Sequence, residues 1–339
     1  SHTGYSMRIF ISGIAGFLGS HLAEHLLADG HEVVGCDTLI GGELINVPPD
    51  AEFYQYDICR RNSMLKITRG CDVIFHAAAT AYEGLSVFSP HLIVENIVTG
   101  SASLFSAAIA NGVKRIIFCS SMARYGTNTV PFKEEYEPKP QDPYGIAKLS
   151  AEQILRNLCE IHNVEYVIAV PHNIIGPRQK YDDPYRNVAS IMINLMLQGR
   201  QPIIYGDGNQ KRCFSFVDDD IYCLKEMVTR DNVLGQVINI GPDEDFITIN
   251  ELAHTIAELL SFDLKPIYMP GRPQEVMLAT CSAEKARKLL DYNTKVTLRE
   301  GLQQMIDFIK TQGTRRFRYH LDLEIINEKT PKTWVNKLF

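Results

Sequence analysis

The feature that most constrains the fold is a glycine-rich turn between a short apolar strand and an amphipathic helix. The strand is predicted at residues 7–12 and the helix at residues 20–28, with Gly13, Gly16 and Gly19 in the turn between them. This order is typical of pyrophosphate-binding sites, because glycine lets the backbone approach the ligand closely and the helix N-terminus offers free N–H groups. A tight turn required only for packing would carry the same glycines, so the motif alone leaves both interpretations open.

A carboxylate follows the second predicted strand, at residues 31–36. Asp37 stands about twenty residues beyond the glycine turn, where a carboxylate can bind both ribose hydroxyls of an adenosine. A negative charge there repels a 2′-phosphate, so the position favours NAD over NADP. A solvated aspartate in a turn is the alternative interpretation.

Short apolar strands alternate with helices through the first half of the chain, which predicts a doubly wound parallel α/β sheet. Further strands are predicted at residues 52–56, 72–75, 115–118 and 164–170, and helices at 90–111 and 144–162. Beyond residue 171 the alternation weakens, and Gly, Pro and Asp become frequent. The predicted organisation is a parallel-sheet domain at 7–171, a smaller mixed α/β domain at 172–310 interleaved with the last sheet elements, and an extension at 311–339.

The composition excludes several classes of protein. The 339 residues carry a net charge of -6 with both signs interspersed, so no contact with nucleic acid is expected. We also expect no apolar run long enough to span a bilayer. The eight cysteines are scattered without a Cys-x-x-Cys pair or a Cys/His cluster, so neither a metal site nor a disulfide framework is predicted. A cytoplasmic protein with reduced thiols is the simplest expectation.

A hydroxyl, a phenol and an amine follow the strand predicted at residues 115–118. Ser120 and Ser121 come directly after that strand, and Tyr144 and Lys148 lie one turn apart on a predicted helix. An ammonium group beside a phenol favours the ionised phenol, which can act as a base. A free phenol titrates near pH 10, so a base that works near neutrality needs about 4 kcal/mol of stabilisation, which a desolvated lysine and a positively charged nicotinamide can supply together. A surface helix with an unrelated Tyr and Lys is the alternative interpretation.

Together these motifs resemble those of the extended short-chain dehydrogenase/reductases, and among them the NAD-dependent nucleotide-sugar epimerases and dehydratases. The resemblance covers nearly the whole chain and implies a Rossmann sheet, NAD as cofactor and a nucleotide diphosphate sugar as substrate. The residues that carry it are Ser12 with the glycine turn, Asp37, Asp57-Ile58, His76-Ala77-Ala78, Ser120-Ser121, Tyr125-Gly126 and Tyr144 with Lys148.

The resemblance also implies roles for individual residues at the cofactor. Tyr144 would take a proton from a sugar hydroxyl, and Lys148 would bind the nicotinamide ribose and lower the pKa of Tyr144. Ser121, rather than Ser120, would donate a hydrogen bond to the reacting oxygen. The residues expected at the cofactor are Gly13, Gly16, Phe17, Leu18, Gly19, Asp37, Asp57, Ile58, Ala77, Ala78, Ala79, Asn96, Tyr144, Lys148 and Pro171.

The substrate side is carried over in the same way. Arg212 and Arg272 match two arginines that clamp the diphosphate, although a surface ion pair is the alternative for each. Glu275 stands where the family usually has an Asp on the nucleotide ribose. Ala279 would leave room for an N-acetyl group on the sugar. The residues expected at the substrate are Arg124, Asn173, Asn187, Val188, Tyr205, Arg212, Arg272, Glu275 and Ala279.

Arg124 departs from the small apolar residue that the family usually has before Tyr-Gly. Its cation can recognise a carboxylate or a diphosphate of the substrate. An ion pair with an acidic loop such as Glu134-Glu135 is an equal alternative.

The reaction is inferred from residues that are missing after Ser121. Met122-Ala123 stand where the resembling dehydratases carry Asp-Glu, where the 3,5-epimerases carry Cys and where the decarboxylases carry Glu. What remains needs only oxidation at sugar C4. We therefore expect a 4-epimerase that acts through a transient 4-keto sugar, with a 4-dehydrogenase or a non-catalytic NAD-binding regulator as alternatives.

The resemblance further implies a homodimer. Helices at 90–111 and 144–162 of each subunit would form a four-helix bundle. The extension at 311–339 mixes basic and aromatic residues, and it is expected to pack on its own subunit or on a partner.

Overall fold

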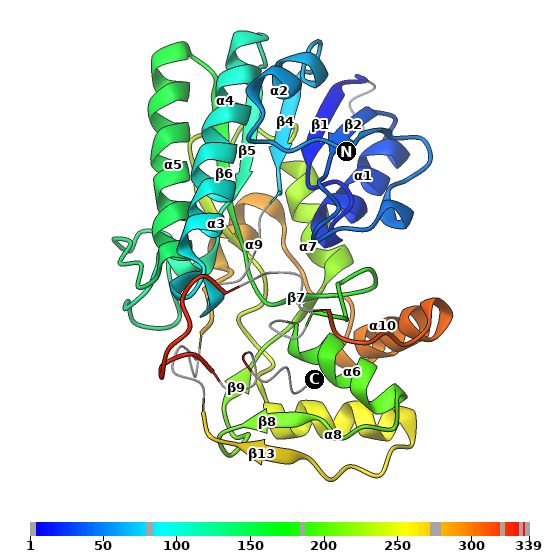
Figure 1. Cartoon of the computed structure of the whole chain (residues 1–339). Helices are drawn as coiled ribbons and strands as arrows, with labels where there is room; N and C mark the ends of the chain where they lie inside the picture. The colour runs from blue at the N-terminus through cyan, green and yellow to red at the C-terminus, as the bar shows by residue number, and fades with distance from the viewer. Residues whose placement is uncertain are drawn as a thin grey trace.

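The computed structural model describes residues 5–78, 84–183, 187–271, 279–318, 323–331 and 335, and the side chains of these residues except 84 and 85. Its centre is a seven-stranded sheet with the order β3-β2-β1-β4-β5-β6-β11, in which every pairing is parallel (Figure 1). The predicted doubly wound α/β sheet is therefore confirmed. The strands are β1 (Arg8–Ser12), β2 (Glu32–Cys36), β3 (Glu52–Tyr54), β4 (Val73–His76), β5 (Arg115–Cys119), β6 (Glu165–Pro171) and β11 (Val237–Ile240).

Helices cover both faces of this sheet because side chains alternate along each strand. On β1, Ile9 and Ile11 belong to one buried cluster and Phe10 to the other. The helices whose side chains join the first cluster are α1 (Phe17–Ala28), α7 (Val217–Glu226) and α9 (Glu284–Leu290). Those that join the second are α2 (Arg61–Ile67), α3 (Pro90–Val94), α4 (Gly100–Ala110) and α5 (Pro143–His162).

One helical stretch of the described residues, Pro90–Ala110, has the length and apolar composition to cross a membrane, contrary to the prediction that no apolar run is long enough. It consists of α3, a π-helical segment (Glu95–Thr99) and α4. Ile93, Ile97 and Leu104 of this stretch are buried in the core beside the sheet. A buried core helix passes the same test of length and composition, so the finding is weak evidence for a span.

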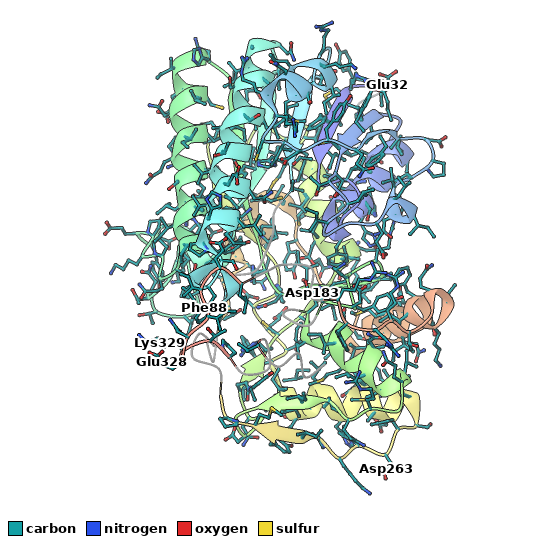
Figure 2. All side chains as sticks on the ribbon, in the orientation of Figure 1. Glu32, Phe88, Asp183, Asp263, Glu328 and Lys329 are labelled. Atoms are coloured by element: carbon teal, nitrogen blue, oxygen red, sulfur yellow. The ribbon has the colours of Figure 1, made fainter. Side chains whose placement is uncertain are left out.

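A second region lies beyond the carboxyl ends of the strands and has its own core, which includes Ile193, Ile256 and Ile306. Figure 2 places Glu32 and Asp263 at opposite ends of the molecule. The division of the chain at residues 171 and 310 stays a prediction. The elements of this region are β7 (Ile174–Ile175), α6 (Val188–Leu197), β8 (Ile203–Tyr205), β9 (Lys211–Arg212), β10 (Ser215–Phe216), β12 (Ile247–Thr248), α8 (Ile249–Leu260), β13 (Ile267–Met269) and α10 (Leu298–Gln312).

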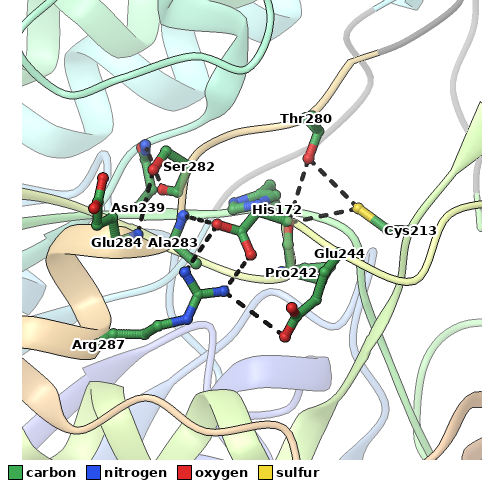
Figure 3. Close-up of polar contacts among 11 residues, drawn as sticks. His172, Cys213, Asn239, Pro242, Glu244, Thr280, Ser282, Ala283, Glu284 and Arg287 are labelled. Carbon is green, nitrogen blue, oxygen red and sulfur yellow. Dashed lines mark hydrogen bonds and ion pairs between the residues drawn. The ribbon is translucent and has the colours of Figure 1, made fainter.

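Polar contacts hold the chain where it leaves β6 and β11 for the second region (Figure 3). His172 Nε2 lies 3.0 Å from the carbonyl oxygen of Pro242, which also accepts hydrogen bonds from Cys213 and Thr280. Burial lowers the pKa of His172, so its ring is neutral and Nε2–H donates. Arg287 forms an ion pair with Asp243. These contacts fix the segment that follows Pro171.

The described part of the C-terminal extension packs on its own chain. Phe317 joins Ile191 of α6 in a small buried cluster. Farther along, the carboxylate of Glu324 accepts the backbone N–H groups of His91 and Leu92 in the first turn of α3, at 2.9 and 3.1 Å. Figure 2 labels Phe88, whose carbonyl oxygen accepts the N–H of Glu324 at 2.9 Å. The extension therefore contacts both the second region and the sheet region.

Candidate active site

A cleft of about 510 Å³ lies at the carboxyl ends of the strands, where the strand order reverses between β1 and β4. Open α/β sheets bind ligands at this point, and the volume is within the range of small-molecule sites. The predicted residues that line the cleft are Gly13, Gly16, Phe17, Leu18, Gly19, Asp37, Asp57, Ile58, Ala77, Ala78, Asn96, Ser121, Tyr144, Lys148, Pro171, Asn173 and Asn187.

Of the other predicted residues, those that the structure describes do not line the cleft. Ala79, Arg272 and Glu275 lie outside the described residues. Tyr205 is buried on β8, and Arg212 Nη1 donates to the carbonyl oxygen of Lys211 at 3.0 Å. Val188 begins α6, and the carbonyl oxygen of Ala279 accepts a hydrogen bond from Asn173. The roles of these residues stay predictions.

The glycine turn has a conformation and a packing that require glycine. Gly13 has φ +72°, and a Cβ there would lie 2.8 Å from Cα of Ala78. A Cβ on Gly19 would lie 2.2 Å from the carbonyl oxygen of Gly13. Gly16 precedes the first residue of α1 and brings no side chain to the helix start. The N-terminal end of α1 is therefore open to an anion in the cleft.

Asp37 ties the end of β2 to the glycine turn. Its Oδ2 accepts the N–H of Ala15 at 3.1 Å, and its Oδ1 accepts the N–H of Leu39 at 2.8 Å. Burial raises the pKa of this carboxyl. The carboxylate lies in the cleft wall, where its remaining lone pairs can accept ribose hydroxyls.

His76, at the end of β4, has a structural role. Its Nδ1 lies 2.6 Å from Ser12 Oγ and its Nε2 lies 2.9 Å from Ser101 Oγ. Burial lowers the pKa of His76 to about 3, so the ring stays neutral. Ser12 Oγ in turn accepts the N–H of Ala78 at 3.0 Å, which fixes the small residues at the cleft wall.

Helix α5 positions the phenol and the amine. Asp142 caps the helix by accepting the N–H of Gly145 at 2.7 Å, so Tyr144 lies in the first turn and Lys148 one turn later. Lys148 Nζ donates to the carbonyl oxygen of Cys119 at 3.0 Å and lies 5.9 Å from the ring centroid of Tyr144. The positive end of the helix dipole and the ammonium group both favour a phenolate at Tyr144.

The amine is buried although it lines the cleft. Only 2% of the surface of Lys148 is exposed, and burial lowers the pKa of its ammonium group to about 8. Burial raises the pKa of the Cys119 thiol to about 12, so this neighbour stays neutral. Ser121 also lines the cleft. Its Oγ accepts the N–H of Ala123 at 3.1 Å, so its hydroxyl proton is not used in that bond.

Arg124 is not at the cleft, which corrects the prediction that it contacts substrate. The short helical turn Met122–Arg124 directs its side chain onto α5, where Nε and Nη2 donate to Oε2 and Oε1 of Glu152 at 2.7 and 2.9 Å. The alternative pairing with Glu134-Glu135 is also wrong. Glu134 accepts the N–H of Asn239 at 3.1 Å instead.

Several cleft residues were not predicted. The loop after β2 packs on the glycine turn, since the N–H of Glu43 donates to the carbonyl oxygen of Ala15 at 3.0 Å. Arg315 forms an ion pair with Glu43 and lies 4.7 Å from the ring centroid of Tyr181. The glycine pair Gly41-Gly42 is the sequence feature that could have indicated a loop at the cleft. No feature of the sequence near Arg315 indicates that it pairs with Glu43. Lys180 and Arg178 also line the cleft.

Residues 9–241 match the family described as "NAD dependent epimerase/dehydratase family". The chain belongs to this family. A UDP-glucose 4-epimerase from Mycolicibacterium smegmatis is 30% identical over 317 residues, which cover 91% of this chain and 100% of that protein. A UDP-N-acetyl-alpha-D-glucosaminuronate decarboxylase from Bacillus cytotoxicus is 30% identical over 322 residues, which cover 89% and 98%.

A solved structure is similar over the same extent. The UDP-glucose 4-epimerase of Thermotoga maritima, crystallised with UDP-glucose, is 32% identical with a TM-score of 0.85 and covers 90% of this chain and 99% of that one. The predicted resemblance, the enzyme class and the cofactor NAD are confirmed. The glycine turn and Asp37 of this epimerase/dehydratase family member fit a dinucleotide, because they join a cradle without side chains to a carboxylate acceptor.

Replacing Asp37 by Ser should change the choice of cofactor. The shorter, neutral side chain loses hydrogen bonds to the adenosine ribose and no longer repels a 2′-phosphate, so affinity for NAD should fall about tenfold while affinity for NADP rises. Calorimetric titration of the parent and the variant with both cofactors measures this change. An unchanged ratio of the two dissociation constants would contradict the role of Asp37.

Proposed function

We propose that the protein is an NAD-dependent nucleotide-sugar 4-epimerase that works through a transient 4-keto sugar. The observation that carries the proposal is the meeting of Ser121, Tyr144 and Lys148 in one cleft with the glycine turn. A hydroxyl donor, a phenol and a buried ammonium group suffice for oxidation of an alcohol beside a dinucleotide.

Each of the three side chains has a separate task. Tyr144, as the phenolate, accepts the proton of the C4 hydroxyl, and Ser121 donates a hydrogen bond to the same oxygen. Lys148 stabilises the phenolate and is placed to bind the nicotinamide ribose. NAD, when bound, would supply the hydride acceptor for oxidation at C4 and, in its reduced form, the hydride donor for reduction of the ketone. Tyr144 returns the proton when the ketone is reduced from its other face.

The residues after Ser121 favour this reaction over related ones. A relative as similar as the epimerases is a decarboxylase, so overall identity does not choose the reaction. Met122 and Ala123 offer no acid and no thiol, and the side chain of Ala123 is buried rather than turned to solvent. Elimination, decarboxylation and 3,5-epimerisation would each need an acid or a thiol at these two positions, and neither residue supplies one.

The alternative within the same chemistry is a 4-dehydrogenase that releases the ketone. A non-catalytic NAD-binding regulator is the other alternative, although it would have no use for the three reactive side chains. We take a UDP-sugar as the substrate, because the similar proteins with 30% identity or more, reported above, are named for UDP-sugars, whereas the similar GDP-mannose 3,5-epimerases are 27–28% identical.

Mixing the purified protein with UDP-glucose and with UDP-N-acetylglucosamine tests the three functions. Transient absorbance of NADH together with the C4 epimer supports the epimerase. Accumulation of NADH together with a 4-keto sugar supports the dehydrogenase, and no change with either sugar supports the regulator. Equal rates on the two sugars would also support the hypothesis that Ala279 leaves space for an N-acetyl group at sugar C2.

The proposal includes a homodimer formed by α3 to α5 of two subunits. Val94, Ile146 and Ile161 on these helices are exposed apolar side chains, with 39%, 52% and 63% of their surface accessible. Burial against the same face of a second copy would remove this apolar surface from water. Light scattering should give twice the chain mass, and a monomer at micromolar concentration would contradict this part.

A further inference from the structure

A buried carboxylate lies one helical turn after Lys148 on α5. Glu152 has no exposed surface, and its Oε2 accepts the hydroxyl of Ser120 at 2.5 Å. Both of its oxygens also accept N–H groups of Arg124, at 2.7 and 2.9 Å. Three donors therefore hold this carboxylate immediately behind the reactive side chains.

Lys148 and Glu152 have the spacing at which opposite charges pair on a helix. In the structure Lys148 Nζ instead donates to the carbonyl oxygen of Cys119 at 3.0 Å. An ammonium group and a carboxylate attract each other strongly where water is excluded. The Lys148 contact with Cys119 thus depends on what occupies the oxygens of Glu152.

Arg124 is the group that occupies them. The residue is 4% exposed, and its guanidinium group donates to both carboxylate oxygens, a geometry that a planar group of donors matches well. Lys148 and Glu152 then hold consecutive residues at the end of β5, the first through the carbonyl of Cys119 and the second through the hydroxyl of Ser120. The next residue is Ser121, and all three residues line the cleft.

We propose that Arg124 and Glu152 are positioning residues, and that Arg124 keeps Glu152 from drawing Lys148 away from Tyr144. This inference rests on the proposed function of Tyr144 and Lys148. The other titratable groups that face Lys148 carry no charge: burial lowers the pKa of His76 to about 3 and raises the pKa of Cys119 to about 12. Glu152 is therefore the group that can compete with the Tyr144 phenolate for the ammonium group of Lys148.

Arg124→Met tests the inference. Released from Arg124, Glu152 should attract Lys148, so the phenol of Tyr144 loses its cation and should titrate about one to three pH units higher. The acidic limb of the pH–rate profile should move by the same amount. Phenolate absorbance, taken as the difference between each protein and its Tyr144→Phe counterpart, follows this titration without any turnover.

Rescue distinguishes positioning from simple support of the fold. In Arg124→Met/Glu152→Gln no carboxylate competes for Lys148, so the titration of Tyr144 should return to that of the parent. Glu152→Gln alone should lower stability but leave the titration in place. If Arg124→Met is insoluble, Arg124→Lys keeps the charge but cannot donate to both oxygens in one plane, and a smaller displacement is expected.

Arg115→Met is the matched control at the opposite end of β5. Arg115 is 3% exposed and donates to Glu165 at 3.0 and 2.6 Å, so its loss also breaks the ion pair of a buried arginine. It should lower the melting temperature and leave the titration of Tyr144 unchanged. The inference would be overturned if Tyr144 titrated in Arg124→Met as it does in the parent, or if its titration in the double variant stayed as high as in Arg124→Met. Failure of the proposed function is a separate result, the absence of sugar conversion by the parent.

Discussion

Replacing Tyr144 by Phe should reduce conversion of the nucleotide sugar by about 10²- to 10⁴-fold, the contribution of a positioned general base. The change removes one oxygen and keeps the ring, which is 5% exposed and packed in the core beside the sheet. Stability and NAD affinity should therefore change little. Steady-state rates, calorimetry with NAD and thermal unfolding of both proteins measure the three quantities.

Tyr166→Phe is the matched control for this substitution. Tyr166 lies on β6, and its hydroxyl donates to Glu160 at 3.4 Å, at an exposed position. The same loss of a phenolic oxygen there should leave the rate unchanged. Parental activity in Tyr144→Phe would show that another group takes the proton.

Replacing Lys148 by Met should abolish activity and stabilise the protein. Activity falls because the phenolate loses its cation and the nicotinamide ribose loses a donor. Stability rises because a buried ammonium group is replaced by an apolar side chain of similar length, although the hydrogen bond to Cys119 is lost. A gain in stability with a loss of turnover is the usual sign of a strained functional group.

The pH dependence of this gain follows from the sign of the pKa shift. Burial lowers the pKa of Lys148 from 10.5 to about 8, so between these values the unfolded chain binds more protons than the folded one. Lys148 therefore makes the parent more stable as pH rises through this window. The advantage of Lys148→Met should be largest below about pH 8 and should shrink toward pH 10.5.

Thermal unfolding of both proteins across this pH range, without added NAD, measures the difference. The Cys119 thiol, which Lys148 contacts electrostatically, has a pKa of about 12 in the folded parent, and the loss of the Lys148 charge raises this pKa further, so the thiol stays protonated in both folded proteins across this window. A variant that is less stable at neutral pH, or a difference that does not depend on pH, would contradict a buried ammonium group at this position.

The parts of the site that the sequence predicted are those with local signals. The turn of Gly13, the carboxylate of Asp37 and the helix of Tyr144 each lie next to a strand or helix whose apolar pattern is clear. The nucleotide side is harder, because β8 and β9 have only three and two residues and show no period. Nothing in so short a segment indicates which way Tyr205 or Arg212 points.

Contacts between distant residues account for the errors. The sequence places Arg124 beside the reactive serines, and only the packing of α5 reveals that Glu152 receives it. Glu43 and Arg315 are brought together by the path of the C-terminal extension along α6, which no local pattern encodes. Charged residues that look available for substrate in a sequence are often already paired inside the fold.

A substrate labelled with deuterium at C4 tests the central claim most directly. Tyr144 and Lys148 are proposed to prepare the alcohol for oxidation, and the hydride is proposed to return to the carbon it left. In a single turnover in ordinary water, reduced nicotinamide should form and decay, and the epimer should keep its deuterium at C4. Loss of the deuterium to water, or an epimer formed without any reduced nicotinamide, would contradict the account.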